Sequence, residues 1–536
     1  MDTSIMFTPK TIFSFMLTIE VLFFWSKFLL RSLSNVHHSL QKKFWFPHDL
    51  QPKLRKYSSF ISKSDNNSRN ETLVFHMEDA LLRSSSLFPY FMLVAFEAGS
   101  LIRAVLLFLA YPFICLFPKE IRIKMMVFVS FFGIKKNKCR VGSSVLPKFF
   151  LEDVGYEGFE VLMRHGRKIG VSDLPNVMVE GFLKDFLGVD VVMGREMKVC
   201  YGYYVGCMEE RRNGYIDSLN QINGEEKINS LVGFGCLGKT LSQEFFSHCK
   251  EIYLVSKSEK RKWHNLPRHK YPRKLIFHDG RLAFRPTFYA TSLMFLWLPF
   301  GIFLCIVRAC AALFLPCRIA LPIFAFSGIQ GKVSYSSANE RAKKSGGTVY
   351  VCNHRTLLDP VYVSMALMEP VTAVTYSVSR VSEMISPIKT TRLKRDRESD
   401  LKMMKEMLKE SNIVVCPEGT TCREPYLLRF SPLFAELTDD IVPVALDMQF
   451  SMFYGTTASG LKCFDPLFFL LNPHPTYTIK FLDPLPASKS FGAGGKSRYE
   501  VANFVQTEIG KALGFECTSL TRKDKYLMLA GNEGVV

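Results

Sequence analysis

The sequence predicts an α/β protein with two sheet-containing domains and several membrane-associated helices. Strand and helix patterns alternate over about 71–275, as in a doubly wound parallel sheet, and apolar strands recur over about 326–490. Of the 536 residues, 48% are hydrophobic and 47 are phenylalanine, which is more than a soluble enzyme usually carries. Because a single hydrophobic core stops growing at about 250–300 residues, we expect two domains with apolar segments before and between them.

The first apolar segment is Ile12–Leu30, which lies in an N-terminal segment of residues 1–70 that closes with a polar linker. Glu20 and Lys27 interrupt the run, and charges are costly at the centre of a bilayer. The run therefore indicates an interfacial helix or a targeting segment. It lacks the small-residue cleavage site that marks a removed signal peptide.

The domain expected over 71–275 has the pattern of a Rossmann-like sheet, with a helical insertion at 89–135 after its first strand. The apolar run Pro89–Phe117 begins this insertion and is interrupted by Glu97 and Arg103. We expect it to form either two shorter helices or a re-entrant hairpin, because these charges disfavour a single membrane span.

The segment 280–325 contains the best candidate for a membrane span. Thr291–Ala312 is apolar except for Arg308, and about 20 apolar helical residues cross a bilayer; a buried core helix is the alternative. The formal net charge is +19, and the basic run Lys257–Lys274 precedes this segment. Such clusters bind anionic lipid headgroups on the cytosolic side. We therefore expect membrane lipids as partners and, since no nucleic-acid motif accompanies the charge, no nucleic acid.

The most informative stretch is Asn353–Asp359, which follows the apolar strand Gly347–Cys352. The strand places His354 and Asp359 together at the mouth of a sheet. A histidine held by a carboxylate can take the proton of a hydroxyl, whose oxygen can then attack an activated carbonyl. For an isolated pair of this kind, a surface loop that caps the next helix would be the simpler interpretation.

A second motif, about sixty residues further on, favours the catalytic interpretation. An apolar strand from Ile413 runs into the tight turn Pro417–Arg423, which offers a carboxylate, a glycine, two hydroxyls and a guanidinium. Arginine is the side chain best suited to a bidentate grip on phosphate. The dense basic cluster Ile388–Arg397 lies between the two motifs, and Ile441–Ala445 predicts another buried strand. The sequence therefore indicates a catalytic base beside an anion site.

These four blocks resemble, in order, those of the PlsC-like glycerolipid acyltransferases: NHRTLLDP, TTRLKRDR, PEGTTCR and IVPVA. With its long N-terminal half, where VMVEGFLKDFLG is also similar, the chain resembles the land-plant glycerol-3-phosphate acyltransferases. The resemblance makes 326–490 the acyltransferase domain. Residues 491–536 are then a C-terminal extension, in which we expect an amphipathic helix over Tyr499–Leu513 and twenty loosely ordered final residues.

The resemblance implies a direct transfer with acyl-CoA and glycerol 3-phosphate as substrates and no cofactor or metal. His354 would be the general base on the acceptor hydroxyl, Asp359 would orient it, and lysophosphatidic acid would be the product. The implied substrate-binding residues are Arg395, Glu418, Gly419, Thr420 and Arg423, with Arg392 and Arg397 as weaker candidates. Asn353, Pro417 and Pro443 would support the motifs.

The N-terminal domain resembles a haloacid-dehalogenase-like phosphatase whose chemistry is lost. Leu73–Leu82 lies where such enzymes carry D-x-D-G-T-L, and His76 and Glu78 occupy the two aspartate positions. These phosphatases use the first aspartate as nucleophile and the second as general acid. Ser172 matches a second phosphatase block, but no acidic pair occurs near 231–240. We therefore expect the product to remain lysophosphatidic acid.

Gly233–Thr240 also matches the P-loop pattern G-x4-G-K-[ST]. The functional interpretation would place nucleotide phosphates on Lys239 and Mg²⁺ on Thr240. No strand ending in a suitable acidic residue follows, so a strand-to-helix turn of the phosphatase-like sheet is favoured.

The 14 cysteines form neither a disulfide framework nor a C-x2-C zinc pair. Cys416 and Cys422 flank the second motif, but the His/Asp pair already supplies the chemistry that a thiol acyl carrier would provide. Two other functions stay open: transfer to another lysolipid acceptor, and a non-catalytic membrane scaffold. We expect the endoplasmic reticulum membrane with a cytosolic active site, or else mitochondria. The motifs do not encode oligomeric state, regiochemistry or acyl preference.

Overall fold

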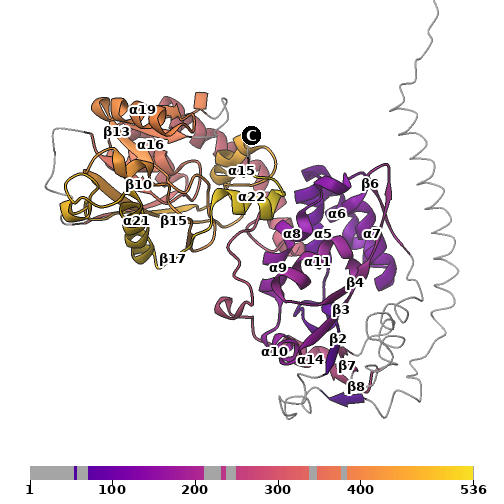
Figure 1. Cartoon of the computed structure of the whole chain (residues 1–536). Coiled ribbons are helices and arrows are strands. Elements are labelled where there is room, and N and C mark those ends of the chain that lie inside the picture. The colour runs from indigo at the N-terminus through magenta and orange to yellow at the C-terminus, as the bar shows by residue number, and fades with distance from the viewer. Residues whose placement is uncertain are drawn as a thin grey trace, which may run out of the picture. The chain divides into compact units, whose positions relative to one another are not determined.

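The computed structural model describes residues 54–56, 71–209, 231–236, 249–336, 347–375 and 383–534 (Figure 1). The chain forms two compact units. The first comprises Met1–Cys139 and Phe150–Pro272, and the second comprises Arg140–Phe149 and Arg273–Val536. The apolar run Ile12–Leu30 lies outside the described residues.

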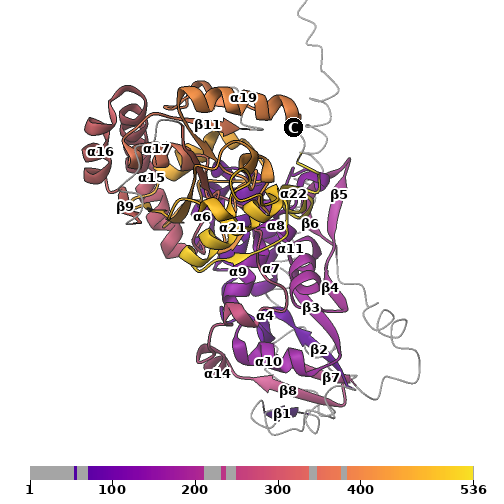
Figure 2. The ribbon, with the colours of Figure 1, turned by 60° about the vertical axis from the view of Figure 1, so that its left-hand side comes forward.

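The first unit is built on a parallel six-stranded sheet, so the Rossmann-like prediction for this half of the chain is confirmed. Figure 2 shows the strands following one another in the order β1-β8-β7-β2-β3-β4. Their bounds are β1 Leu54–Lys56, β8 Glu251–Val255, β7 Leu231–Cys236, β2 Thr72–His76, β3 Arg167–Pro175 and β4 Val191–Arg195. All neighbouring pairs are parallel.

The insertion after β2 consists of short helices, as one of the two sequence interpretations predicts. They are α4 Met77–Ala80, α5 Phe88–Val94, the π-helix η2 Ala95–Gly99, α6 Leu101–Ile114 and α7 Lys119–Phe131. Every residue of α5 is buried, whereas α6 exposes Ile102, Leu106 and Leu109. The remaining elements of this unit are η3 Lys136–Lys138, α10 Tyr156–Arg164, α11 Asn176–Gly181, η4 Phe182–Phe186, the hairpin β5 Met197–Cys200 and β6 Tyr203–Met208, α14 Lys257–Arg261 and η6 Arg268–Lys270.

The P-loop pattern begins inside a strand of this sheet. Gly233 to Cys236 belong to β7 and pair with β2 and β8. Backbone N–H groups that pair within a sheet cannot also wrap a phosphate, which favours the structural interpretation of this segment. Lys239 and Thr240 lie outside the described residues.

The second unit has a mixed seven-stranded sheet in the order β12-β11-β13-β10-β15-β16-β9. The first five strands are parallel, and β16 and β9 run the other way. Their bounds are β12 Thr390–Arg392, β11 Val371–Thr375, β13 Asn412–Val415, β10 Val349–Cys352, β15 Ile441–Gln449, β16 Thr476–Phe481 and β9 Gln330–Tyr335. The carboxyl ends of the parallel strands share one edge, where open α/β sheets place ligands.

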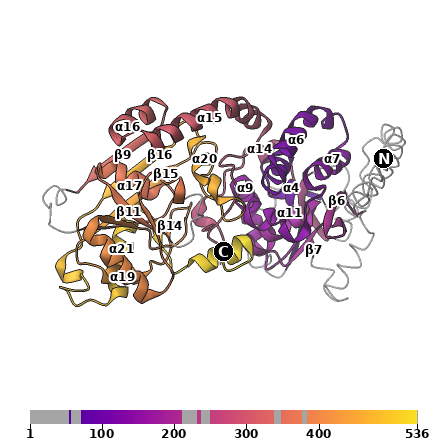
Figure 3. The ribbon, with the colours of Figure 1, turned by 90° about the horizontal axis from the view of Figure 1, so that it is seen from above.

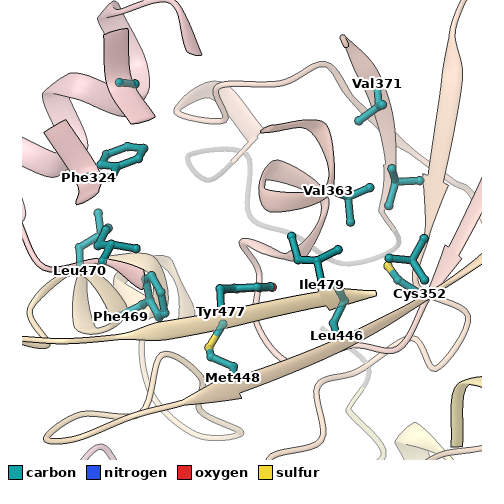
Figure 4. Close-up of a cluster of buried hydrophobic side chains, with 14 of the residues drawn as sticks. Phe324, Cys352, Val363, Val371, Leu446, Met448, Phe469, Leu470, Tyr477 and Ile479 are labelled. Atoms are coloured by element: carbon teal, nitrogen blue, oxygen red, sulfur yellow. The ribbon is translucent and has the colours of Figure 1, made fainter. Parts of the chain in front are cut away.

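Helices cover both faces of this sheet (Figure 3). On one face lie α15 Phe288–Phe314, α16 Cys317–Phe326, α17 Asp359–Leu367 and α20 Asp465–Leu470, and on the other lie α19 Arg397–Glu410 and α21 Arg498–Leu513. Residues alternate between faces along β10, because Val351 packs in the second cluster while Cys352 packs with Val363 and Leu446 in the first (Figure 4). The other elements are α8 Val141–Ser144, α9 Leu146–Asp153 (which runs into the first unit), β14 Tyr426–Leu427, η8 Pro432–Glu436, η9 Lys462–Phe464, η10 Ala487–Lys489, β17 Glu516–Cys517 and α22 Arg522–Ala530.

Helix α15 is long and apolar enough to cross a membrane, but one of its faces packs on the second unit. Arg308 is fully buried in that face. Its Nη1 donates to the carbonyls of Leu470 at 2.5 Å and Asn472 at 2.7 Å, and its Nη2 donates to that of Ser327. The charge near the end of the apolar run therefore fastens the helix to the loop after α20.

The C-terminal residues are more ordered than the sequence suggests. The predicted helix over Tyr499–Leu513 is confirmed as α21, with Ser497 and Glu500 forming a capping box. The prediction of loose order over the last twenty residues is wrong, because α22 occupies Arg522–Ala530 and begins with a capping box of its own.

Candidate active site

His354 and Asp359 lie together in the loop that leaves β10. The carboxylate of Asp359 is fully buried and accepts a hydrogen bond from Nδ1 of His354 at 2.8 Å. It also accepts from the backbone N–H groups of Arg355 at 2.6 Å and Thr356 at 3.0 Å, and from the hydroxyl of Tyr477. Bonding through Nδ1 leaves Nε2 of His354 as the ring nitrogen that can take a proton.

The surroundings of His354 favour its charged form. Burial lowers the pKa of His354, but the neighbouring Cys416 and the hydrogen bond to Asp359 raise it well above its usual value. The Cys352 thiol and burial raise the pKa of Cys416 well above its usual value, so Cys416 is a neutral thiol at neutral pH. The Asp359 carboxylate is therefore the cause on which the raised pKa of His354 depends.

The turn after β13 is tied to the histidine loop through Glu418. Its carboxylate accepts the backbone N–H of His354 at 2.7 Å and that of Leu428 at 2.9 Å, and burial raises its pKa to about 7. Asn353 exchanges two hydrogen bonds with the backbone of Leu446 in β15, at 2.8 and 2.9 Å. Both side chains therefore hold the loop in place through hydrogen bonds to the backbone.

Glycine and proline serve the backbone of this site. Gly419 has φ +64°, a conformation that favours glycine and lets the turn reverse. The Pro417 carbonyl accepts the N–H of Ser431 at 2.9 Å. Pro443 lies within β15, in register with Val351.

Arg423 is committed to internal contacts. Its guanidinium donates to the hydroxyl of Thr456 at 2.9 Å and the carbonyl of Gly280 at 2.8 Å, lies 3.5 Å from Asp279, and stacks 4.3 Å from the ring of Tyr454. It is also almost fully buried. These contacts stabilise the turn and leave Arg423 poorly placed to bind a phosphate.

Arg395 is differently placed. It follows β12, at the same edge of the sheet as His354, and is exposed. Its neighbours in the basic cluster are paired: Arg392 with Glu383 at 2.9 Å and Arg397 with Glu436 at 2.7 Å. Within the described parts of the chain Arg395 has no ion-pair partner, so it can bind an anionic ligand.

Lys525, in the C-terminal helix α22, reaches the same turn. Its buried ammonium group donates to the Thr421 carbonyl at 2.5 Å, the Thr421 hydroxyl at 3.1 Å and the Thr420 hydroxyl at 3.3 Å. Burial lowers the pKa of Lys525. Thr420 is thus held by a hydrogen bond from a residue about one hundred positions further along the chain.

The first unit carries a second cluster of charged groups, at the carboxyl end of β2. Nδ1 of His76 lies 3.0 Å from Asp79 and 3.5 Å from Glu78, and its Nε2 lies 3.7 Å from Asp173. The Ser172 hydroxyl donates to Glu78 at 2.5 Å. Burial lowers the pKa of His76, but Glu78, Asp173 and Asp79 together raise it to about 10.

Two lysines complete this cluster. Lys119 pairs with Asp173 at 3.0 Å, and the buried Lys260 donates to the carbonyl of Glu78 at 2.5 Å. The cluster therefore holds three cationic side chains, His76, Lys119 and Lys260. They lie beside three carboxylates, those of Glu78, Asp79 and Asp173. A Mg²⁺ ion prefers a shell of oxygen ligands, and an imidazolium stands among the carboxylates that would supply it. The residues present do not fit the metal of a haloacid-dehalogenase-like phosphatase.

Comparison with known proteins assigns both units. Residues 72–255 match the family model "Glycerol-3-phosphate acyltransferase RAM2-like, HAD-like domain", and residues 335–447 match the Acyltransferase model. The chain is 55% identical to "Probable glycerol-3-phosphate acyltransferase 3" of Arabidopsis thaliana, with 91% of this chain and 94% of that protein covered. It belongs to the plant glycerol-3-phosphate acyltransferase family.

Two further members of this acyltransferase family are similar over most of their length. "Glycerol-3-phosphate acyltransferase 1" of Arabidopsis thaliana is 46% identical, covering 91% of this chain and 87% of that protein. "Glycerol-3-phosphate acyltransferase RAM2" of Petunia hybrida is 42% identical, covering 86% of this chain and 97% of that protein. The family resemblance read from the motifs is thereby confirmed.

Three residues of the acyltransferase site escaped sequence reasoning. Tyr477 and Lys525 lie far along the chain from both motifs, and no local pattern marks either one. Arg355 adjoins His354, and it donates to the carbonyls of Cys422 and Glu424, each at 2.9 Å. The position of Arg355 within the first motif is the sequence feature that could have indicated its part in the site.

We expect Arg423→Ala to lower the free energy of unfolding by about 3 kcal/mol, because it leaves Asp279 buried without its cation. Arg395→Ala is the matched control and should change stability by less than about 0.5 kcal/mol, as exposed substitutions do. Denaturant unfolding of the detergent-solubilised protein measures both. Equal effects of the two substitutions would contradict the structural role of Arg423.

Proposed function

We propose that this chain transfers an acyl group from acyl-CoA to a hydroxyl of glycerol 3-phosphate. The observation that carries the proposal is the 2.8 Å hydrogen bond from His354 Nδ1 to the buried Asp359, in a family whose members bear that activity in their names. Glycerol 3-phosphate is the acceptor; another lysolipid acceptor and a non-catalytic scaffold are the alternatives.

The proposed step needs only the groups already described. Nε2 of His354 takes the proton of the acceptor hydroxyl while its oxygen forms a bond to the thioester carbonyl carbon. The carbon–sulfur bond then breaks, and the coenzyme A thiolate recovers the proton from His354. Asp359 stabilises the imidazolium that exists between these two transfers. No covalent acyl-enzyme is needed.

Arg395 is the residue proposed to bind the phosphate of the acceptor. It is exposed at the edge of the sheet that carries His354, whereas Arg423 is used internally. The Arg395→Ala variant should therefore raise the KM for glycerol 3-phosphate and leave the KM for acyl-CoA unchanged. Equal changes in the two constants would sink this assignment.

The first unit is proposed to lack phosphatase activity, so that lysophosphatidic acid is the final product. His76 replaces the nucleophile, and it lies among Glu78, Asp79 and Asp173, the carboxylates available to hold a metal. A neutral imidazole would be required for any attack on phosphorus, and the raised pKa of His76 keeps the ring protonated near neutral pH.

Product analysis tests both parts of the proposal. Membranes that contain the protein are given glycerol 3-phosphate and a mixed acyl-CoA panel, and we expect lysophosphatidic acid to accumulate. A positioned general base raises the reaction rate about 10²–10⁴-fold, so the activity of His354→Ala should fall at least about 100-fold. His474→Ala, at an exposed histidine of the same unit, should keep it.

Each other outcome of this assay has a distinct meaning. Monoacylglycerol in place of lysophosphatidic acid would show that the first unit is an active phosphatase. Acyl product with a lysolipid but none with glycerol 3-phosphate would show a different acceptor. Full activity in His354→Ala would remove the histidine from the mechanism.

The pH dependence follows from the raised pKa of His354. A general base works in its neutral form, so kcat/KM should rise with pH, and the midpoint of that rise should lie above 6.5, the usual pKa of histidine. In Asp359→Asn the carboxylate that raises the pKa is gone. We expect its midpoint to move to lower pH and its rate to fall at least about 100-fold. Asp483→Asn, at a carboxylate that accepts a hydrogen bond from Ser336 and not from His354, should match the unaltered protein. An unmoved midpoint in Asp359→Asn would contradict the role of Asp359.

We further propose that α15 and α16 bind the membrane surface, at the endoplasmic reticulum with the active site facing the cytosol, where both substrates are available. Support comes from the exposed apolar side chains of these helices: Tyr289, Leu296, Phe303, Phe314 and Phe326. Because the opposite face of α15 packs on the sheet domain and buries Arg308, the helix lies in the interface.

Charged substitutions test this membrane proposal. The triple variant Leu296→Glu, Phe303→Glu and Phe314→Glu should shift the protein from the membrane pellet toward the soluble fraction at high salt. The matched control is Leu461→Glu, Phe491→Glu and Tyr499→Glu, at exposed apolar residues elsewhere in the second unit. Unchanged partitioning of the first triple variant would exclude α15 as the main anchor.

A further inference from the structure

Two thiols lie beside the proposed catalytic base. Cys352 ends β10 and Cys416 follows β13, and these neighbouring parallel strands pair through Val351 and Val415. The two sulfur atoms are 3.4 Å apart. Ligand atoms of Cys416, His354 and Asp359 also lie within 4.8 Å of one another. The cluster joins two soft ligands to an imidazole at the edge of the sheet.

Asp359 belongs to the outer shell of this cluster. Its two oxygens already accept hydrogen bonds from the backbone of Arg355 and Thr356 and from the side chains of His354 and Tyr477. It therefore orients His354 through Nδ1 and leaves Nε2 as the ring nitrogen that can bind an ion. This carboxylate–histidine arrangement is the usual support of a metal-bound imidazole.

The donor set suits a borderline-soft divalent ion. Zinc binds thiolate sulfur at about 2.3 Å and imidazole nitrogen at about 2.0–2.1 Å, in a tetrahedral arrangement. Two sulfur ligands of one such ion lie roughly 3.8 Å apart by this geometry, so the sulfur pair at 3.4 Å requires only a small adjustment. Cys352 lies outside the 4.8 Å group of Cys416, His354 and Asp359, so its sulfur approaches His354 when the ion binds. Thiolate and imidazole ligands disfavour Mg²⁺ and Ca²⁺.

We propose that Cys352, Cys416 and His354 form an inhibitory site for a thiophilic divalent ion such as Zn²⁺. On binding, each thiol releases its proton to solvent, and protonated His354 releases the proton of Nε2. Both sulfur–metal bonds then form without any change of oxidation state. Nε2 of His354 donates its lone pair to the ion, and water fills the fourth position. Binding of the ion does not depend on the proposed function; its effect on turnover does, because the base is then occupied.

The cluster is accessible to an ion from one side. Cys352 is fully buried within the core of the second unit, whereas Cys416 and His354 are partly exposed. An ion would therefore meet Cys416 and His354 first and complete its coordination with Cys352. Because the buried cysteine makes no contact with substrate in the proposed mechanism, it can be altered without removing the base.

Inhibition by buffered free Zn²⁺ is the first experiment, with radiolabelled lysophosphatidic acid as the readout and a non-thiol phosphine reductant present throughout. We expect activity to fall as free Zn²⁺ rises and to return when a chelator is added. Loss of an outer-shell partner costs about 10–100-fold in metal affinity. Loss of a direct ligand in Cys352→Ala should therefore raise the half-inhibitory concentration by about 100-fold or more, with basal activity kept.

Two further variants control for packing. Cys352→Val also lacks the sulfur but enlarges the side chain, and it should behave as Cys352→Ala does. Cys463→Ala removes a partly exposed cysteine elsewhere in the second unit and should leave inhibition unchanged. Equal sensitivity of Cys352→Ala and the unaltered protein would overturn the site.

Cobalt absorption separates metal binding from catalysis. Co²⁺ added to the purified, detergent-solubilised protein should give thiolate-to-metal charge-transfer bands of tetrahedral intensity. These bands should weaken in Cys352→Ala and vanish when Cys416→Ala is added to it. Bands without inhibition would leave the ion bound but overturn its inhibitory role and question His354 as the base. Inhibition that a chelator cannot reverse would overturn the proposal in favour of thiol oxidation.

Discussion

The buried carboxylate of Asp359 is the group on which the acyltransferase site depends. A buried charge is tolerated only when its hydrogen-bonding capacity is satisfied. Asp359 meets this requirement by gathering the N–H groups of Arg355 and Thr356, the hydroxyl of Tyr477 and the ring of His354. The contacts that satisfy this buried charge also fix the conformation of the loop, the tautomer of His354 and the direction of its Nε2.

The parallel register of β10 and β13 supplies the second constraint. It brings the loops that follow the two strands to the same edge, so that Glu418 can accept the N–H of His354 at 2.7 Å. Two motifs that are 64 residues apart in sequence therefore form one rigid site. Lys525 extends the arrangement from the C-terminal helix α22, because its buried ammonium group donates to Thr420 and Thr421.

The sequence predicts those elements of the fold that are determined by interactions between neighbouring residues. The strands before both motifs, the Rossmann-like alternation and the C-terminal helix α21 follow from apolar runs, turn residues and caps, all of which act within a few residues. Contacts between segments that are far apart in the sequence could not be predicted. Whether Arg423 or Arg395 is available depends on Asp279, Tyr454 and Thr456, which no motif connects to either arginine.

The proximity of the two thiols is another long-range placement that no local sequence pattern indicates. Metal sites are recognised in a sequence by short spacings such as C-x2-C, and Cys352 and Cys416 are 64 positions apart. Only strand pairing makes them neighbours. Helix α15 illustrates the converse case, since composition alone cannot distinguish a spanning helix from one that buries Arg308 against the carbonyls of a folded domain.

The charge cluster of the first unit shows how a phosphatase-like sheet can balance its carboxylates with cations from its own chain. Carboxylates gathered at the end of β2 repel one another unless a cation lies among them, and His76 and the two lysines provide that cation from within the chain. The folded pKa of His76, about 10, exceeds its usual 6.5. Its stabilisation is therefore complete below about pH 6.5 and is lost as pH rises through 10. Near neutral pH most of this stabilisation remains, so His76 acts as an internal counterion to the carboxylates of the first unit.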